Sequence, residues 1–194
     1  MKTLFISLKI FLFFTVLTGI IYPLFVTGIA QLAFPAKANG SLIIKDNKMI
    51  GSELIGQRFD SIIYFSSRSS AISYNPLPSG GSNLGLTNVK LKHAVDSLKK
   101  QFIVYNQLDK NAVIPSEMIF ASASGLDPHI SPQAALLQVE RISKARNLDN
   151  NKKQRLLECI KELSEKPTFM VLGEERINVL NLNIKLDEIN EKSN

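Results

Sequence analysis

An uncharged stretch of 25 residues, Ile10–Phe34, most constrains how this chain can fold, and Lys9 and Lys37 flank it. As a helix rising 1.5 Å per residue it would extend roughly 37 Å, more than the ~30 Å hydrocarbon core of a bilayer. Pro23 interrupts it, but membrane helices tolerate prolines where neighbouring groups satisfy the freed carbonyl. We therefore predict a transmembrane helix over residues 10–34.

A cleaved signal peptide is the alternative interpretation of this stretch. Residues 36–38, Ala-Lys-Ala, form a small-x-small cleavage pattern, but signal peptides have apolar regions of roughly 7–15 residues. The length therefore favours an uncleaved anchor. Lysines are nearly balanced on the two flanks, so charge alone does not fix the orientation. Because long domains translocate largely regardless of charge, we expect residues 1–9 in the cytoplasm and the following domain outside, on the cell membrane.

Composition restricts the classes of function open to the remaining chain. Apolar residues make up 45% and charged residues 21%, so we expect a packed domain over residues 35–188 and a frayed tail over 189–194. The net charge of +6 is spread along a chain without Trp, which gives no support for nucleic-acid binding. Cys159 is the only cysteine, and His93 and His129 lie far apart. We predict no disulfide and no metal site.

Hydrophobic periodicity predicts a mixture of short strands and helices. Ser131-Pro132 is typical of a helix start, with Ser as N-cap and Pro at the first helical position. Leu residues alternate with polar ones over 180–186, which indicates a strand with one buried face. The expected strands are 41–44, 49–55, 168–172 and 176–186, the last two joined as a hairpin, and the expected helices are 89–106, 132–146 and 152–164. Residues 62–66 form another short apolar run. Without a regular βαβ rhythm, this order indicates an α+β domain.

The segment 122–131, SASGLDPHIS, concentrates candidate catalytic side chains. Asp127 and His129 could act as acid and base, with Ser122 or Ser124 as nucleophile, which would make the chain a membrane-anchored hydrolase. However, two residues with one proline between them form no standard catalytic pair. A catalytic triad can still be built from residues that are distant in the sequence. Turn formation and helix initiation, serving an interface, is the favoured interpretation. We therefore predict no catalytic residues.

Two further polar loops could carry a binding site. Ser79-Gly80-Gly81-Ser82-Asn83 could cradle a phosphate with its backbone amides, but the chain lacks the Gly-Lys-Ser/Thr of a P-loop. A turn or a protein contact is favoured there. Arg68, in a serine-rich loop, could pair with a carboxylate on a partner, although most such arginines are solvated. Gln138 shows no special chemistry by itself.

Several segments together resemble the C subunit of the Kdp-type potassium-transporting P-type ATPase. They are GSELIGQRF (51–59), YFSSRSSA (64–71), SGGSNLG (79–85), ASASGLDPHISPQAA (121–135), QVERISKAR (138–146) and LGEERINVLNLN (172–183). The apolar stretch lies where that family has its membrane helix. Ser69, Ala123 and Leu86 depart from residues that the family often has, Pro, Gly and Pro respectively, and all three lie in loops.

The resemblance implies an accessory, non-catalytic subunit whose partners are the potassium-transporting and ATP-hydrolysing subunits and the lipid bilayer. The family role is assembly and stabilisation, or that of a catalytic chaperone that raises ATP affinity. No tightly bound cofactor is implied, but nucleotide contact is implied at Ser79, Gly80, Gly81, Ser82 and Gln138. Interface contacts are expected at Arg68, Asn83, Asp127 and His129. A domain outside the membrane meets no cytoplasmic ATP, so any effect on ATP affinity would have to pass through coupled conformational states.

Overall fold

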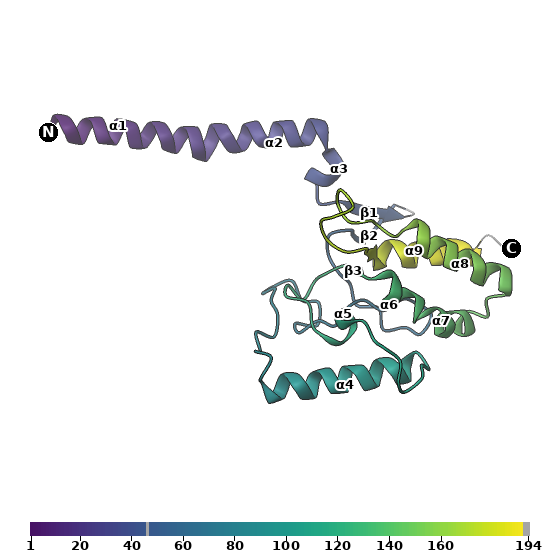
Figure 1. The fold of residues 1–194 in the computed structure, drawn as a ribbon. Coiled ribbons are helices and arrows are strands. Elements are labelled where there is room, and N and C mark those ends of the chain that lie inside the picture. Colours follow the sequence, from purple (N-terminus) through teal and green to yellow (C-terminus); the bar gives the residue numbers. More distant parts are fainter. Residues whose placement is uncertain (46, 192–194) are drawn as a thin grey trace. The chain divides into compact units, whose positions relative to one another are not determined.

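The computed structural model describes residues 1–45 and 47–191 (Figure 1). The chain divides into two compact units, Met1–Ser52 and Glu53–Asn194, which we describe separately. The predicted boundary lies after the apolar stretch, at residue 35, whereas the first unit extends to Ser52.

The first unit begins with one long apolar helix. It comprises α1 (Lys2–Val16), a π-helical turn η1 (Leu17–Ile21) and α2 (Tyr22–Ala33), so the helix continues through Pro23 as predicted. The π-helical turn ends two residues before the proline, which removes one donor from the regular hydrogen-bond ladder. None of its residues is buried, and the helix is long and apolar enough to cross a membrane.

The rest of the first unit is a short helix followed by a hairpin. After α3 (Pro35–Ala38), β1 (Leu42–Lys45) pairs antiparallel with β2 (Lys48–Ser52), with Leu42 opposite Ser52 and a bulge between Ile43 and Ile44. The two predicted strands are therefore confirmed, although the second ends at Ser52 and not at residue 55. The turn residue Asp46 lies outside the described residues.

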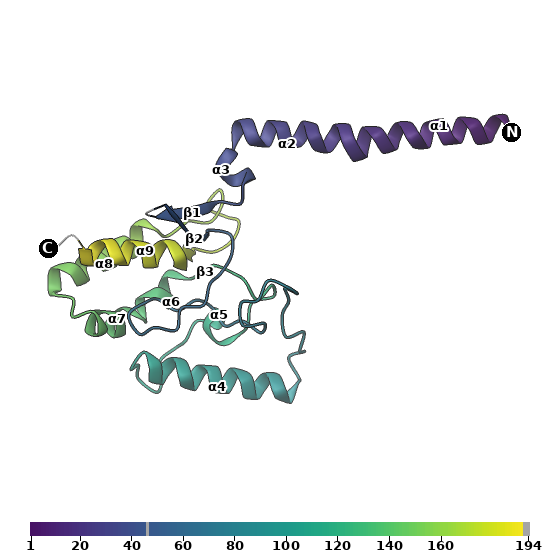
Figure 2. The same cartoon turned by 180° about the vertical axis from the view of Figure 1, so that it is seen from behind.

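The second unit is mixed α+β with very short strands. Its elements are α4 (Val89–Tyr105), α5 (Ser116–Ile119), β3 (His129–Ile130), α6 (Pro132–Leu136), α7 (Val139–Ala145), α8 (Asn150–Glu162), β4 (Ile177–Asn178) and α9 (Val179–Glu191). Strands β3 and β4 pair antiparallel. Helices α8 and α9 lie side by side, with α4 at the opposite edge of the unit in both views (Figures 1 and 2).

Side-chain caps fix the starts of the helices. Asn88, Ser131 and Asp149 accept hydrogen bonds from the backbone N–H groups of residues 90, 134 and 152 at 2.8, 3.1 and 2.8 Å. The helices predicted over 89–106 and 152–164 and the Ser131 cap are confirmed. The helix predicted over 132–146 is instead two helices, because the N–H of Gln138 bonds back three residues to Ala135 and tightens the chain there.

The predicted hairpin of strands 168–172 and 176–186 is wrong. Residues 179–191 form α9, which buries Val179, Leu182, Leu186 and Ile189 at a helical spacing of three and four residues. A smaller hairpin forms around residues 169–171, closed by the Thr168–Leu172 and Glu165–Arg176 bridges. Helix α9 includes residues 189–191 of the tail expected to be frayed, and residues 192–194 lie outside the described part.

The short apolar run over 62–66 forms no strand, and its backbone pairs with side chains. Asn183 on α9 accepts from the N–H of Phe65 at 2.8 Å and donates to its carbonyl at 3.0 Å. Gln138 does the same for Ser66 at 2.8 and 3.4 Å. Both amide side chains are buried, and Phe65 lies in the core. Side chains thus hold residues 65 and 66 in the domain, while residues 61–64 form a turn that the N–H of Tyr64 closes on the carbonyl of Ser61 at 3.1 Å.

We predict that Asn183→Ala lowers the free energy of unfolding of the full chain in detergent by about 2–5 kcal/mol, because it leaves the buried N–H and carbonyl of Phe65 without partners. Denaturant unfolding followed by circular dichroism measures this loss. Asn181→Ala is the matched control on the same helix, since the Asn181 side chain bonds Glu53 at an exposed site, and we expect a loss within about 0.5 kcal/mol. Equal losses in the two variants would contradict the prediction.

Candidate functional site

The candidate site is built on the segment 62–66, which begins in a turn and whose remaining carbonyl groups are bound by two arginines of the second unit. Arg141, 3% exposed, donates to the carbonyls of Ile62 and Tyr64. Arg146 donates to the carbonyl of Ile63 at 2.7 Å and pairs with Asp187 at 2.7 Å. These contacts hold the backbone of residues 62–64 in place. They thereby position the serine-rich loop that follows Ser66 and carries Arg68.

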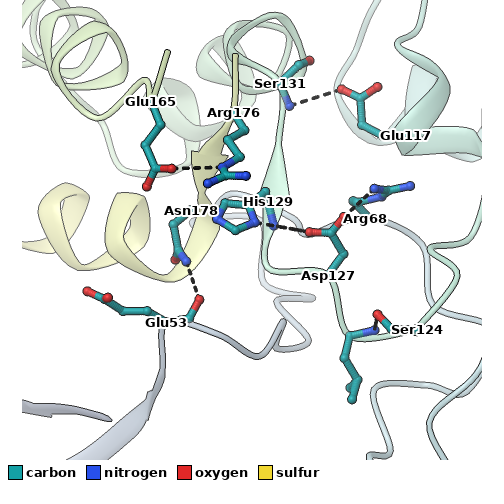
Figure 3. A network of polar contacts seen from close by, with 11 residues as sticks. Glu53, Arg68, Glu117, Ser124, Asp127, His129, Ser131, Glu165, Arg176 and Asn178 are labelled. Atoms are coloured by element: carbon teal, nitrogen blue, oxygen red, sulfur yellow. Dashed lines mark hydrogen bonds and ion pairs between the residues drawn. The ribbon is translucent and has the colours of Figure 1, made fainter. Parts of the chain in front are cut away.

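Arg68, Asp127 and His129 meet at the centre of the site. Arg68 Nη1 lies 2.5 Å from Asp127 Oδ2, while Asp127 Oδ1 accepts from the backbone N–H of His129 at 3.0 Å and lies 3.4 Å from its Nδ1. Figure 3 shows the Asp127 carboxylate between the other two side chains. The sequence interpretation gave Arg68 a carboxylate on a partner, whereas the structure provides one within the chain, 59 residues away.

The environment of Asp127 favours its charged form. Partial burial by itself would raise its pKa, but hydrogen bonds from His129 and the charge and hydrogen bond of Arg68 outweigh it and lower the pKa from 3.8 to about 2. The side chains of Arg68 and Asp127 are 24% and 30% exposed. The pair is thus a half-buried ion pair that is ionised at neutral pH.

Backbone contacts bring three other loops against the segment 122–127. The N–H groups of Gly56 and Gly80 donate to the carbonyls of Leu126 and Ser124 at 2.7 and 3.0 Å, and Ser122 N–H donates to Ser69 at 3.1 Å. A Cβ atom added at Gly56 would lie 2.6 Å from the Asp127 carbonyl oxygen, so this approach needs glycine. Four of the segments that carry the family resemblance, 51–59, 64–71, 79–85 and 121–135, therefore meet around residues 122–127.

A polar cavity of about 600 Å³ opens beside the ion pair. Its charged and titratable lining consists of Arg68, Glu117, Asp127, His129, Glu174, Glu175 and Arg176. Glu117 accepts from the N–H of Ser131 at 3.2 Å, and Arg176 pairs with Glu165 at 2.9 Å (Figure 3). Sequence reasoning missed residues 117 and 174–176, because non-local contacts place them at this cavity. The β3–β4 pairing brings 174–176 close, and Glu117 on α5 is placed by its bond to Ser131.

A second cavity, of about 700 Å³, lies along α4. Seven of its sixteen lining residues are aromatic or aliphatic, among them Phe59, Tyr74, Phe102, Tyr105 and Met118. Arg68 lines both cavities, and within the described residues its buried Nε has no hydrogen-bond partner. No sequence pattern pointed to this cavity, since its walls come from three separate stretches of chain.

The residues expected to contact nucleotide are not all accessible. Ser79 and Ser82 are exposed, but the N–H of Gly80 is bound to Ser124, and Gly81 packs against Ala123. Gln138 is fully buried, with its amide bound to Ser66, Ala134 and Arg141. A nucleotide would reach the Gln138 amide only if the Ser66 loop moved away. Nucleotide contact at these residues stays a prediction.

The other expected interface residue, Asn83, is exposed and has a left-handed backbone, with φ 53°. It does not join the contacts that link Arg68, Asp127 and His129 in the described part of the chain. Its role at an interface stays a prediction, as do the interface roles of those three residues.

The serines proposed as nucleophiles of a hydrolase have other surroundings. Ser122 is 3% exposed, and the Ser124 hydroxyl accepts a hydrogen bond from the N–H of Leu126 at 3.1 Å. Within residues 1–45 and 47–191, no serine hydroxyl is hydrogen-bonded to His129. The turn interpretation agrees with the geometry, since Asp127 accepts from the N–H two residues ahead and Ser131 caps α6. The same described residues contain no cluster of three His, Cys, Asp or Glu suited to a metal.

Comparison with known proteins gives matches over nearly the whole chain. The family model described as KdpC, K+-transporting ATPase, c chain, matches residues 4–188. The chain is 43% identical to the potassium-transporting ATPase KdpC subunit of Photorhabdus laumondii, over 96% of both chains. It is 44% identical to that of Leptospira interrogans, over 94% of this chain and 92% of the relative. The KdpC subunit of Herpetosiphon aurantiacus is 48% identical, over 94% of both chains.

We predict that Asp127 makes the stability of the chain depend on pH between about 4 and 2. Its folded pKa lies below the ordinary value, so the ionised carboxylate stabilises the folded state above pH ~4, and this contribution is lost as the pH falls towards 2. Asp127→Asn should lower the free energy of unfolding by about 1–2 kcal/mol at pH 7 and flatten its decline in acid. Denaturant unfolding at several pH values measures both. Parallel pH profiles of the parent and the variant would contradict the prediction.

Proposed function

Because this chain belongs to the KdpC family of K+-transporting ATPase c chains, we propose that it is an accessory subunit that leaves ATP hydrolysis and potassium transport to other subunits. The observation that carries the proposal is the extent of the match, which includes both the apolar helix and the folded unit. The relatives are matched over at least 92% of their own length. The proposed role is to assemble and stabilise the complex.

The proposal anchors the chain in the cell membrane through helix Lys2–Ala33, with the amino terminus in the cytoplasm and the folded unit outside. The helix exposes apolar side chains along its whole length, as a lipid-facing segment requires. The hydroxyls of Thr15 and Thr18 donate to carbonyls of the preceding turn at 2.8 and 2.7 Å. These two polar groups are therefore satisfied within the helix and do not oppose insertion.

We place the contact with partner subunits on the loops around Arg68, Asp127 and His129, together with the exposed Asn83 loop. These loops are held by buried side chains and glycine contacts and not by long strands, so their exposed edges are preorganised. A preorganised surface loses less entropy on binding. This preorganisation of the loops supports a docking role. The half-buried Arg68–Asp127 ion pair by itself would support only a contribution to the stability of the fold.

The proposal also includes an increase in the ATP affinity of the hydrolysing subunit. With the folded unit outside the membrane, this effect would pass through conformational states of the complex that the unit stabilises unequally. The full burial of Gln138 supports this indirect route over direct contact between ATP and the Gln138 amide.

We predict that the full chain, solubilised in mild detergent, co-purifies with a potassium-transporting and an ATP-hydrolysing membrane subunit. Potassium-stimulated ATPase activity should fall when the chain is omitted, since the complex would assemble poorly. Mass spectrometry of the bound subunits and a phosphate-release assay measure the two effects. The purified chain alone should release no more phosphate than its His129→Ala variant. A chain that hydrolyses ATP without partners, and loses this activity in His129→Ala, would overturn the accessory role.

A further inference from the structure

One loop of the folded unit exposes four consecutive large apolar side chains. Phe169, Met170, Val171 and Leu172 are 85%, 83%, 80% and 63% exposed, and we call residues 169–172 the apolar tip. Scattered exposed apolar residues are ordinary in soluble domains, but a contiguous cluster marks an interaction surface. The tip contributes nothing to the buried core, so burial within this chain does not account for its composition.

The tip is presented on a short, closed stem. Thr168 and Leu172 exchange backbone hydrogen bonds at 2.9 and 3.0 Å, and Glu165 and Arg176 do so at 2.8 and 3.1 Å. The side chains of Glu165 and Arg176 add an ion pair at 2.9 Å. The apolar tip is therefore held in one conformation before any partner binds, which lowers the entropy lost on docking.

The residues of the tip are poorly suited to its backbone. Phe169 and Met170 have φ of 55° and 61°, and the N–H of Val171 donates to Thr168 at 3.3 Å, as in a type I′ turn. That turn strongly favours Asn-Gly at its two central positions, and bulky residues with positive φ are uncommon. Local conflicts of this kind are expected where a side chain serves a function and not the fold.

The charge around the tip favours a protein partner over lipid. The tip continues through Gly173 into Glu174, Glu175 and Arg176, which line the polar cavity. That cavity has four carboxylates and two guanidinium groups, although the chain as a whole has a net charge of +6. Arg68 and Arg176 are already paired, whereas Glu174 and Glu175 have no ion-pair partner in the described part of the chain. Such an acidic surface is repelled by anionic lipid headgroups.

We propose that the apolar tip is the anchor by which this chain docks into an apolar pocket, bordered by basic side chains, on another subunit of the same complex. This proposal rests on the accessory function proposed above. The tip provides the apolar centre of the contact and the acidic cavity its polar edge, which is the usual arrangement of a protein interface.

The test uses Phe169→Asn together with Met170→Gly in the full chain. The favoured Asn-Gly turn should leave the thermal midpoint equal to that of the parent or higher, while the amount of co-purified ATPase subunits falls at least tenfold. Val113→Asn, which replaces a 78% exposed apolar residue in the loop between α4 and α5, is the matched control and should retain parental co-purification. A parent chain that fails to co-purify would refute the accessory function. A parent and a double variant that co-purify equally would refute the anchor alone.

A photo-reactive amino acid in place of Val171 identifies the molecule that contacts the apolar tip in the assembled complex. A cross-link to a different subunit supports the proposal, and the same probe at position 113 should give no such product. Cross-links only to lipid or only to a second copy of this chain would overturn it, as would the absence of any cross-link at position 171.

Discussion

Five consecutive residues, 62–66, have their backbone groups bound by side chains, and the organisation of the folded unit follows from these bonds. Buried peptide groups need hydrogen-bond partners. Here side-chain amides and guanidinium groups provide those partners for the N–H and carbonyl groups of the segment. Asn183 and Gln138 each bind both the N–H and the carbonyl of one residue. The segment thereby links α9 to the junction of α6 and α7, and it fixes the start of the loop that carries Arg68.

From this centre the contacts extend outward to the surface. Arg68 pairs with Asp127, whose turn receives the backbones of Gly56 and Gly80. The same turn leads into β3, which pairs with β4 and so brings the Glu165–Arg176 stem beside His129. The apolar tip at the end of that stem takes no part in the core. We therefore interpret the unit as a rigid base of polar contacts that presents an apolar anchor, tethered by an apolar helix.

The sequence predicted the elements whose signals are local. Caps and helical spacing located α4, α8 and the start of α6, and the length of the apolar stretch located the first helix. The alternation of Leu and Asn residues led to the wrong prediction of a strand over 176–186. Leu182 and Leu186 fit helical and strand spacing alike. Asn183 is buried because its side chain binds the backbone of Phe65. The sequence pointed to Asp127 and His129 together and to Arg68 separately. Their juxtaposition depends on contacts across 59 residues, which no local pattern encodes.

Hydrogen exchange of the full chain, alone in detergent and in the assembled K+-transporting complex, tests most directly whether a preformed base presents an anchor to a partner. The account predicts that the amides of Phe65 and Ser66 exchange slowly and equally in both samples. The peptide that contains residues 168–172 should become protected only in the complex. Protection of residues 65 and 66 that appeared only on assembly, or a tip that exchanged at the same rate in both samples, would contradict the account.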